Sequence, residues 1–161
     1  MTNTRTTRLK GRHLVLIDFE NMAGTADPTP GEVDGVALTL RDAVPAFDGA
    51  HVVVACSHHA ARTVAFAFPR ARHLWRSGPD GADLALLDVL DNERVDQRFE
   101  HVTICSGDGI FAASAALLGG AGVKVTVVSL HGHLATRLRL AARSVVYLPT
   151  VAADVTTGSA S

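Results

Sequence analysis

The feature that most constrains this fold is a regular alternation of short apolar runs with segments of helical character. Short continuous apolar runs are typical of strands that are buried on both faces. Six such runs occur: His13–Asp18, His51–Cys56, Arg72–Trp75, His101–Cys105, Val123–Ser129 and Ser144–Leu148. Helices are expected between them over Gly35–Phe47, His59–Phe68, Ala82–Val95, Gly109–Leu118 and His133–Ala142. Strands that alternate with helices predict βαβ units and a parallel sheet with helices on both faces.

One stretch, Phe19–Asp34, shows neither pattern and is rich in Gly, Pro, Thr and Asp, so we expect a long loop there. No repeat or linker divides the chain. Its 161 residues, 47% of them hydrophobic, suit a single domain with a full core. We therefore expect one domain over residues 13–148, between a basic flexible tail (1–12) and a flexible tail rich in small residues (149–161).

The formal net charge of −1 excludes a strong attraction of the whole molecule to nucleic acid, so any contact with a polyanion must be local. Cys56 and Cys105 each end an apolar run, which indicates buried, reduced thiols rather than a disulfide. There is no signal-peptide pattern and no apolar run long enough to cross a bilayer. We expect a cytoplasmic protein without a membrane partner, and the sequence leaves a homodimer open.

Acidic residues follow three of the predicted strands. Asp18 ends the first strand, Asp83 begins the helix after the third, and Asp108 follows the fourth within Ser106-Gly107-Asp108-Gly109. Parallel strands end at one edge of a sheet, where ligands bind, so these carboxylates are expected to converge. Like charges repel unless a cation lies among them, and a set of oxygen ligands suits Mg²⁺ or Mn²⁺.

Capping of the following helix is the simpler explanation for each of these acids alone. The candidates for that role are Asp80 or Asp83 before one helix and Ser106 or Asp108 before another. Asp18 precedes no predicted helix, and an unpaired carboxylate is costly to bury, so capping does not account for all three positions. Asp88 lies about 7.5 Å farther along its helix than Asp83 and on another face, which makes it a weaker candidate.

Other catalytic motifs find little support. The sequence has no G-x-G-x-x-G, G-x-x-x-x-G-K-[ST] or G-x-S-x-G motif. Cys56-Ser57-His58-His59 suggests a nucleophile or zinc site, but neighbouring histidines are poorly placed to share a metal and no C-x-x-C accompanies them. The roles of His58 and His59 stay open, including contact with a substrate. A phosphatase of the haloacid dehalogenase type requires an Asp two residues after Asp18, where this chain has Glu20.

Three segments together resemble a known family. LVLIDFENM (14–22), GADLALLDVL (81–90) and ICSGDGIF (104–111) are similar in order and spacing to the three motifs of NYN domains, which are PIN-like nucleases, and the LabA-like branch is the most similar. The resemblance implies a PIN-like, three-layer α/β/α sandwich with a central parallel sheet. It also implies a metal-dependent ribonuclease that hydrolyses RNA phosphodiester bonds at a carboxylate cluster holding Mg²⁺ or Mn²⁺.

The resemblance also assigns residues. Asp18, Asp83 and Asp108 are implied as catalytic metal ligands, Asn21 as the amide that orients a ligand or a metal-bound water, and Ser106 as the small polar residue before the Gly-Asp turn. The chain departs from the family at Ile110, where a second acid is usual, and the helix motif commonly has its second acid one position after Asp88. Glu20 and Asp88 are candidates to compensate.

The expected substrate is single-stranded RNA, because unpaired strands reach a shallow edge more easily than duplexes. Arg76 and the basic tail are expected to contact phosphates. Trp75 is interpreted either as a stacking surface for a base or, more simply, as a core residue. The alternative function is a catalytically degenerate NYN-fold module that binds RNA or protein without cutting, for which Ile110 is the main support.

Overall fold

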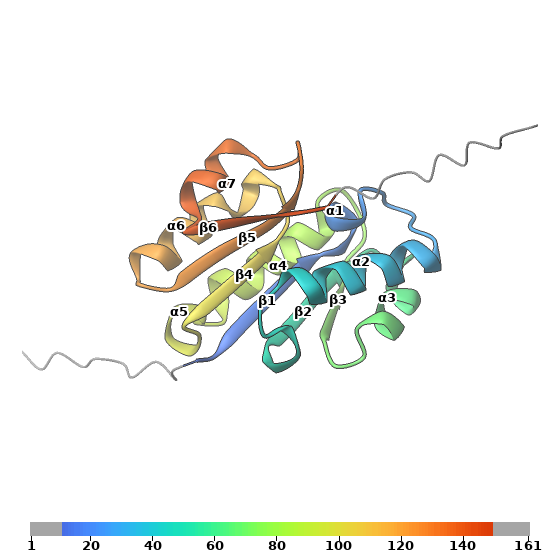
Figure 1. Cartoon of the computed structure of the whole chain (residues 1–161), viewed down its shortest axis with the longest axis horizontal. Helices are drawn as coiled ribbons and strands as arrows, with labels where there is room; N and C mark the ends of the chain where they lie inside the picture. The colour runs from blue at the N-terminus through green and yellow to red at the C-terminus, as the bar shows by residue number, and fades with distance from the viewer. Residues whose placement is uncertain (1–10, 150–161) are drawn as a thin grey trace, which may run out of the picture.

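The computed structural model describes residues 11–149, which form a six-stranded sheet with helices on both sides (Figure 1). The strands are β1 (His13–Asp18), β2 (His51–Cys56), β3 (Arg72–Trp75), β4 (His101–Cys105), β5 (Lys124–Leu130) and β6 (Ser144–Leu148). The helices are α1 (Phe19–Ala23), α2 (Pro30–Ala43), η1 (Phe47–Gly49), α3 (Ala61–Ala67), α4 (Gly81–Asn92), α5 (Val95–Arg98), η2 (Gly109–Phe111), α6 (Ala112–Gly120) and α7 (Thr136–Ala141).

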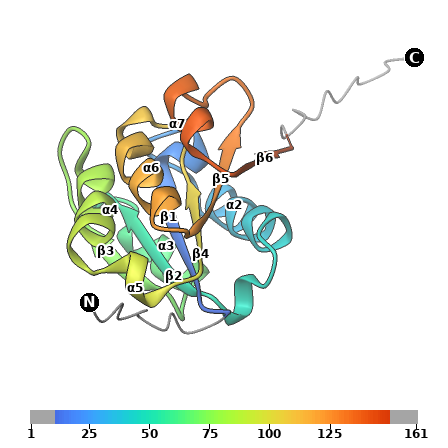
Figure 2. The same cartoon turned by 90° about the vertical axis from the view of Figure 1, so that its left-hand side faces the viewer.

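All strand pairs are parallel, and the order across the sheet is β3-β2-β1-β4-β5-β6. Figure 2 shows α2 on one side of the sheet and α4, α5 and α6 on the other. The protein is therefore an α/β domain with a three-layer α/β/α architecture, as the alternating pattern predicts.

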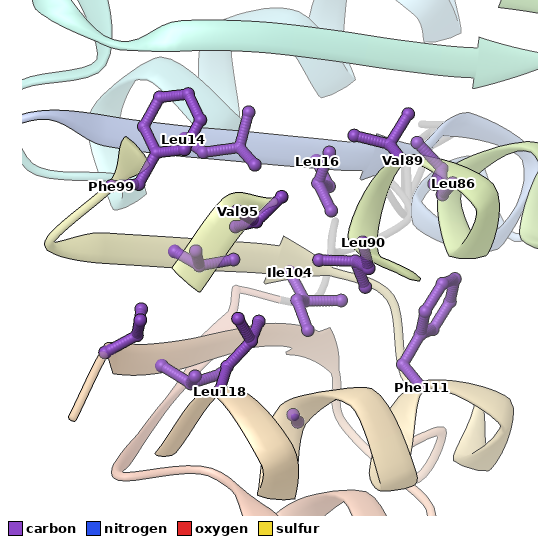
Figure 3. Close-up of a cluster of buried hydrophobic side chains, with 14 of the residues drawn as sticks. Leu14, Leu16, Leu86, Val89, Leu90, Val95, Phe99, Ile104, Phe111 and Leu118 are labelled. Atoms are coloured by element: carbon purple, nitrogen blue, oxygen red, sulfur yellow. The ribbon is translucent and has the colours of Figure 1, made fainter. Parts of the chain in front are cut away.

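Two apolar clusters, one on each face of the sheet, hold the layers together. On the α4–α7 face, Leu86, Val89 and Leu90 of α4 pack against Leu16 and the other inward side chains of β1 and β4 (Figure 3). On the opposite face, residues of α1, α2 and α3 pack against alternate residues of the same strands. Burial on both faces explains why the strands are continuously apolar instead of alternating with polar residues.

The register of the central strands places the ends that matter for function. In the β1–β4 pair Ile17 lies opposite Cys105, so the next residues, Asp18 and Ser106, emerge side by side. In the β1–β2 pair Asp18 lies opposite Ala55. At the centre of the carboxyl edge of the sheet, the Asp18 carboxylate thus lies beside the Ser106 hydroxyl.

Five strands have the predicted bounds, and β5 is shifted by one residue, to Lys124–Leu130. The predicted long loop Phe19–Asp34 is wrong. Asp18 leads directly into α1, and α2 begins at Pro30 behind a capping box in which Thr29 and Glu32 bond each other's backbone N–H groups. Thr-Pro-x-Glu is a sequence signal for a helix start, because Pro is preferred in the first turn and Glu at the third position.

The remaining helices differ from prediction mainly at their ends. α2 stops at Ala43 because Pro45 disfavours helical backbone in the residue before it. The segment expected as one helix over Ala82–Val95 is two, since Arg94 adopts left-handed backbone with φ 52° between α4 and α5. The Gly109–Leu118 helix opens with a 3-10 turn and runs to Gly120, while α3 and α7 are shorter than expected at both ends.

Of the two predicted tails, only Gly11, Arg12 and Pro149 lie within the described residues. Arg12 bonds His51 at 2.9 Å and lies over the Phe99 ring. Residues 1–10 and 150–161 lie outside the described part of the chain. Between residues 11 and 149 no helix is both long and apolar enough to span a membrane.

Candidate functional site

The centre of the carboxyl edge is the point where the chain changes direction across the sheet. After β1 the connection through α1 and α2 leads to β2 on one face, whereas β4 continues through η2 and α6 to β5 on the other face. In doubly wound sheets this reversal opens a crevice outside the strand ends, where ligands bind. Asp18 and Ser106 stand at this point.

Asp18 is buried, with 4% of its surface exposed. Its Oδ2 accepts a hydrogen bond from the Ser106 hydroxyl at 3.2 Å, and its Oδ1 accepts one from the Asn21 backbone N–H at 3.4 Å. The expectation that Asp18 precedes no helix is therefore wrong, because it is the N-cap of α1. Capping uses one of its oxygens weakly and does not explain why the group is buried beside a second acid.

That second acid is Asp83, in the first turn of α4 and 8% exposed. Asp18 and Asp83 line the same cleft, and the interaction with Asp83 raises the pKa of Asp18. Asp83 does not cap α4, whose N-cap is Asp80, and its buried Oδ1 has no hydrogen-bond partner among the described residues. A buried carboxylate oxygen without a partner is costly unless a proton or a cation meets it.

The two carboxyl groups perturb each other's protonation. Burial and the neighbouring Asp83 raise the pKa of Asp18 to about 8, although hydrogen bonds from Asn21 and Ser106 act in the opposite direction. Burial also raises the pKa of Asp83, and the charges of Asp108, Asp80 and Glu20 add to this effect. At neutral pH the pair therefore retains a proton when no cation is present to neutralise it.

Residues of the third motif, ICSGDGIF (104–111), lie beside Asp18 and are hydrogen-bonded to one another. The Asp108 N–H donates to the Ser106 hydroxyl at 3.2 Å, and Asp108 Oδ1 accepts the Ile110 N–H at 2.8 Å. The Asn21 side-chain oxygen accepts the Gly107 N–H at 3.0 Å, which ties α1 to the end of β4. The side-chain oxygen of Asn21 is thus already hydrogen-bonded within the protein.

The structure brings together two of the three predicted carboxylates. Asp108 acts on Asp83 only as a nearby charge, and Ser106 lies between Asp108 and Asp18. Within residues 11–149 no three Asp, Glu, His or Cys side chains converge closely enough to hold a metal ion by themselves. The carboxylate of Asp108 instead caps η2.

Asp18 and Asp83 line a cleft of about 290 Å³. Glu20, Asn21, Ser57, Arg76 and Asp80 also line it. Glu20 accepts the Ser57 N–H at 2.5 Å, while Glu20 Oε2 and the Ser57 hydroxyl are buried without partners among the described residues. Of the segment Cys56-Ser57-His58-His59, Ser57 lines the cleft, whereas the two histidines do not.

Arg76 and Trp75 lie at the β3 side of this cleft. Arg76 lines it and takes part in none of the ion pairs found among residues 11–149, so its guanidinium is free to meet an anion. Trp75, at the end of β3, is 50% exposed, so its interpretation as a core residue is wrong. Trp75 does not line the cleft, and its ring lies 6.2 Å from the ring of His73 on the same strand.

Two glycines at this edge allow close backbone approaches. A Cβ at Gly107 would collide with the His133 carbonyl, and one at Gly81 would collide with the Arg76 carbonyl. Neither glycine has positive φ, so their role here is the close packing of the backbone. Gly109 is packed against the Arg137 side chain of α7, which brings a cation next to the residue that follows Asp108. The sequence did not indicate Arg137, because α7 follows β5 and not β4.

Three other candidates lie outside the cleft. His58 contacts Ser77 through its Nδ1 at 2.6 Å, and His59 is exposed. Asp88 accepts a hydrogen bond from Asn92 on α4 at 2.6 Å. Neither histidine nor Asp88 lines the cleft, whereas Glu20 does.

The residues present fit a divalent cation such as Mg²⁺ or Mn²⁺. The donors are all oxygens, two carboxyl groups adjoin, and Asp83 Oδ1 lacks a partner. Mg²⁺ is commonly bound by one or two carboxylates, with water and substrate phosphates completing its shell. Asp18 and Asp83 would hold the ion.

The protein is a doubly wound α/β domain with an acidic cleft at the carboxyl ends of β1, β2 and β3, beside the switch point between β1 and β4. No family model and no curated protein matches the chain. The fold is similar to the crystal structure of a protein of unknown function from Vibrio parahaemolyticus, with a TM-score of 0.54, 17% sequence identity, and coverage of 86% of this chain and 93% of that one. At this identity the likeness concerns the fold alone.

Proposed function

We propose that this protein is a divalent-metal-dependent ribonuclease that hydrolyses single-stranded RNA in the cleft beside Asp18 and Asp83. The observation that carries the proposal is the adjoining buried pair of carboxyl groups, one oxygen of which has no partner among the described residues. The resemblance of the three motifs to NYN domains supplies the reaction class. Both features fall on the same edge of the sheet.

Asp18 and Asp83 are the proposed ligands of Mg²⁺ or Mn²⁺. A bound divalent ion supplies an activated water and neutralises the charge that builds on the phosphate oxygens during hydrolysis. The Ser106 hydroxyl and the Asn21 N–H fix the orientation of the Asp18 carboxylate. Such supporting hydrogen bonds matter because they hold a ligand in its productive orientation.

Asp108 and Arg76 contribute by charge from opposite sides. Asp108 stands near Asp83 and strengthens the local negative field, which attracts a cation. Arg76 lines the cleft and is free to bind a phosphate oxygen of the RNA backbone. Trp75, the residue before it, offers an exposed ring for an unpaired base outside the cleft. Together they favour a flexible single strand over a duplex.

The proposal is tested by cleavage of an end-labelled single-stranded RNA with Mn²⁺ or Mg²⁺ and with EDTA. We expect cleavage only with metal, and a loss of about 100-fold or more in Asp18→Asn or Asp83→Asn, since each removes a charged ligand. Asp88→Asn is the matched control, because Asp88 lies on the same helix as Asp83 but outside the cleft. It should cleave like the wild type.

Activity that persists in EDTA, or an Asp83→Asn protein as active as Asp88→Asn, would contradict the proposal. A duplex of the same sequence serves as the substrate control, and it should be cut more slowly. Circular dichroism of each variant separates a loss of the site from a loss of the fold.

The second candidate function is a binding module that has lost catalysis. It is favoured by Ile110 in place of the usual acid and by the lack of a three-ligand group within residues 11–149. Ile110 packs against the apolar cluster on the α4–α7 face, so an acidic side chain at this position would lie against apolar residues. This function predicts RNA binding without products, with an affinity that Asp18→Asn leaves unchanged.

A further inference from the structure

A second cavity, of about 680 Å³, opens between α2 and the ends of β5 and β6. Met22 and Leu148, both buried, and the partly buried Val36 and Leu130 give it apolar walls, while the exposed His131 and His133 stand among its lining residues. This volume and this mixture of apolar surface with a few polar groups are typical of sites that hold a small organic ring.

The cavity adjoins the acidic cleft across one short helix. In α1, Asn21 lines the cleft, whereas Met22 and Ala23 line the cavity. The His133 carbonyl also packs against Gly107, whose N–H is bound by Asn21. From β1 to β6 the sheet crosses three strand spacings, or about 14 Å, so a few nucleotides of an extended strand would reach from one site to the other.

The chemistry of the cavity suits a base better than a phosphate. No Lys or Arg is among the described residues that line it, and the carboxylate of Glu32 is engaged with the Thr29 N–H at 2.7 Å. At one side, His131 stacks on Tyr147 with ring centroids 4.7 Å apart and an interplanar angle of 15°. Tyr147 is 40% exposed, so this pair presents aromatic surface beside the cavity.

We propose that this cavity is a subsite for an unpaired nucleobase of the RNA strand whose phosphate lies in the acidic cleft. The inference rests on the proposed ribonuclease function for the identity of its ligand. It adds a recognition element on the β6 side of the sheet, opposite Trp75 and Arg76. An RNA strand that contacts Arg76 on the β3 side and this cavity on the β6 side would pass over Asp18 and Asp83.

Gly35 offers a way to fill the cavity without disturbing the fold. It lies in α2, lines the cavity, and a Cβ there would meet nothing within 4 Å. Gly35→Leu therefore places a side chain in the cavity and removes a glycine from a helix. Gly31→Leu is a second variant with the same two properties. Gly119→Leu in α6 is the matched control, since it adds an exposed leucine outside this cavity.

The probe is a labelled single-stranded RNA pentamer, bound in EDTA and followed by fluorescence anisotropy, beside the same pentamer with one base removed. We expect the wild type to bind the intact pentamer more tightly than the abasic one. Gly35→Leu should weaken the intact pentamer by about tenfold and leave the abasic one unchanged, in line with the worth of one stacked base. Gly119→Leu should match the wild type.

Equal binding of intact and abasic RNA by the wild type, no binding of either, or no effect of both glycine variants would overturn the subsite. A changed sedimentation coefficient in Gly35→Leu with unchanged RNA affinity would assign the cavity to protein contact and also overturn it. Base-dependent binding without cleavage in Mn²⁺ would support the subsite and refute the ribonuclease proposal. The two failures are thus distinguishable.

Discussion

At the scale of single residues, the protein tolerates a buried acid that works against its own stability. Asp18 is held with a pKa of about 8, whereas an unfolded Asp titrates near 3.9. Between these values the folded state keeps a proton that the unfolded state releases. Capping alone does not require the acid, because an amide of the same shape would cap α1 equally well.

The pH dependence of stability follows from this difference. Because the folded pKa is raised, the contribution of Asp18 is present below pH 4 and is lost as the pH rises towards 8. In EDTA the free energy of unfolding should therefore fall over that range. Asp18→Asn should flatten the dependence and be more stable than the wild type at pH 8, on the order of 2–4 kcal/mol. Urea denaturation at several pH values measures this, and parallel curves for wild type and variant would sink it.

Gly107 is a second residue whose identity is fixed by its surroundings. Gly107→Ala places a methyl group against the His133 carbonyl, so we expect a loss of about 1–3 kcal/mol in the free energy of unfolding. Gly119→Ala is the control, since a Cβ there meets nothing within 4 Å and helix propensity favours alanine by about 1 kcal/mol. Thermal and urea melts compare them. Equal stability of the two variants would contradict the packing explanation.

At the scale of elements, α1 joins the ends of two central strands. It begins at the Asp18 cap, and its Asn21 side chain holds the buried Gly107 N–H at the end of β4. The helix is only five residues long, and isolated helices of that length are unstable. Its position therefore depends on these contacts and on buried Phe19 and Met22.

Asn21→Ala should destabilise the protein by about 1–2 kcal/mol, because it leaves the buried Gly107 N–H without its partner. Asn92→Ala is the matched control, since it removes an amide bond to Asp88 on the exposed surface of α4. The control should cost no more than about 0.5 kcal/mol. A loss in Asn21→Ala no larger than in Asn92→Ala would show that the bond to Gly107 does not hold α1 in place.

The strands could be predicted from the sequence and the helix ends could not, for a physical reason. A strand buried on both faces must be apolar throughout, so residues such as Val53 and Ile104 mark it directly. Helix ends depend on caps and turns, and the capping box at Thr29 was hidden inside a stretch that resembles a loop. The late start of α7 accompanies a hydrogen bond from the Ala135 N–H to the Gly107 carbonyl, which no local pattern records.

The candidate site was predictable only in part for the same reason. Topology brings Asp18 to the switch point and the first turn of α4 to the same edge, so their meeting followed from the pattern of elements. Whether Asp108 turns its carboxylate inward depends on a single backbone bond, the one from Ile110. Arg137 comes from a segment without a recognisable motif, and nothing in Cys56-Ser57-His58-His59 indicates that its serine would enter the cleft and its histidines would not. Only the packing of the folded chain places these residues.

At the scale of the whole molecule, apolar side chains cover both faces of the sheet, and the two thiols lie among them. Cys56 and Cys105 are free and fully buried, as predicted. Burial raises the pKa of Cys56 to about 12, with a further effect from Glu20, and burial also raises that of Cys105. Thiolates are the reactive form, so both groups should be inert in the native state.

A thiol-reactive dye such as dithionitrobenzoate tests this prediction. We expect no rapid reaction in native buffer and release of two equivalents on unfolding, since the chain has two cysteines. The rate in native buffer should follow the opening of the fold and rise in Gly107→Ala. Reaction of either thiol at the rate of a free peptide cysteine would show that the sheet is not closed as described.

The most direct test of the account is a crystal of the protein soaked in Mn²⁺ and read by anomalous diffraction. We expect a peak between the carboxyl groups of Asp18 and Asp83, and no peak there in Asp83→Asn crystals soaked in the same way. A map with no signal in this cleft, or with an ion bound elsewhere and indifferent to Asp83, would contradict the claim that these two acids form a cation site.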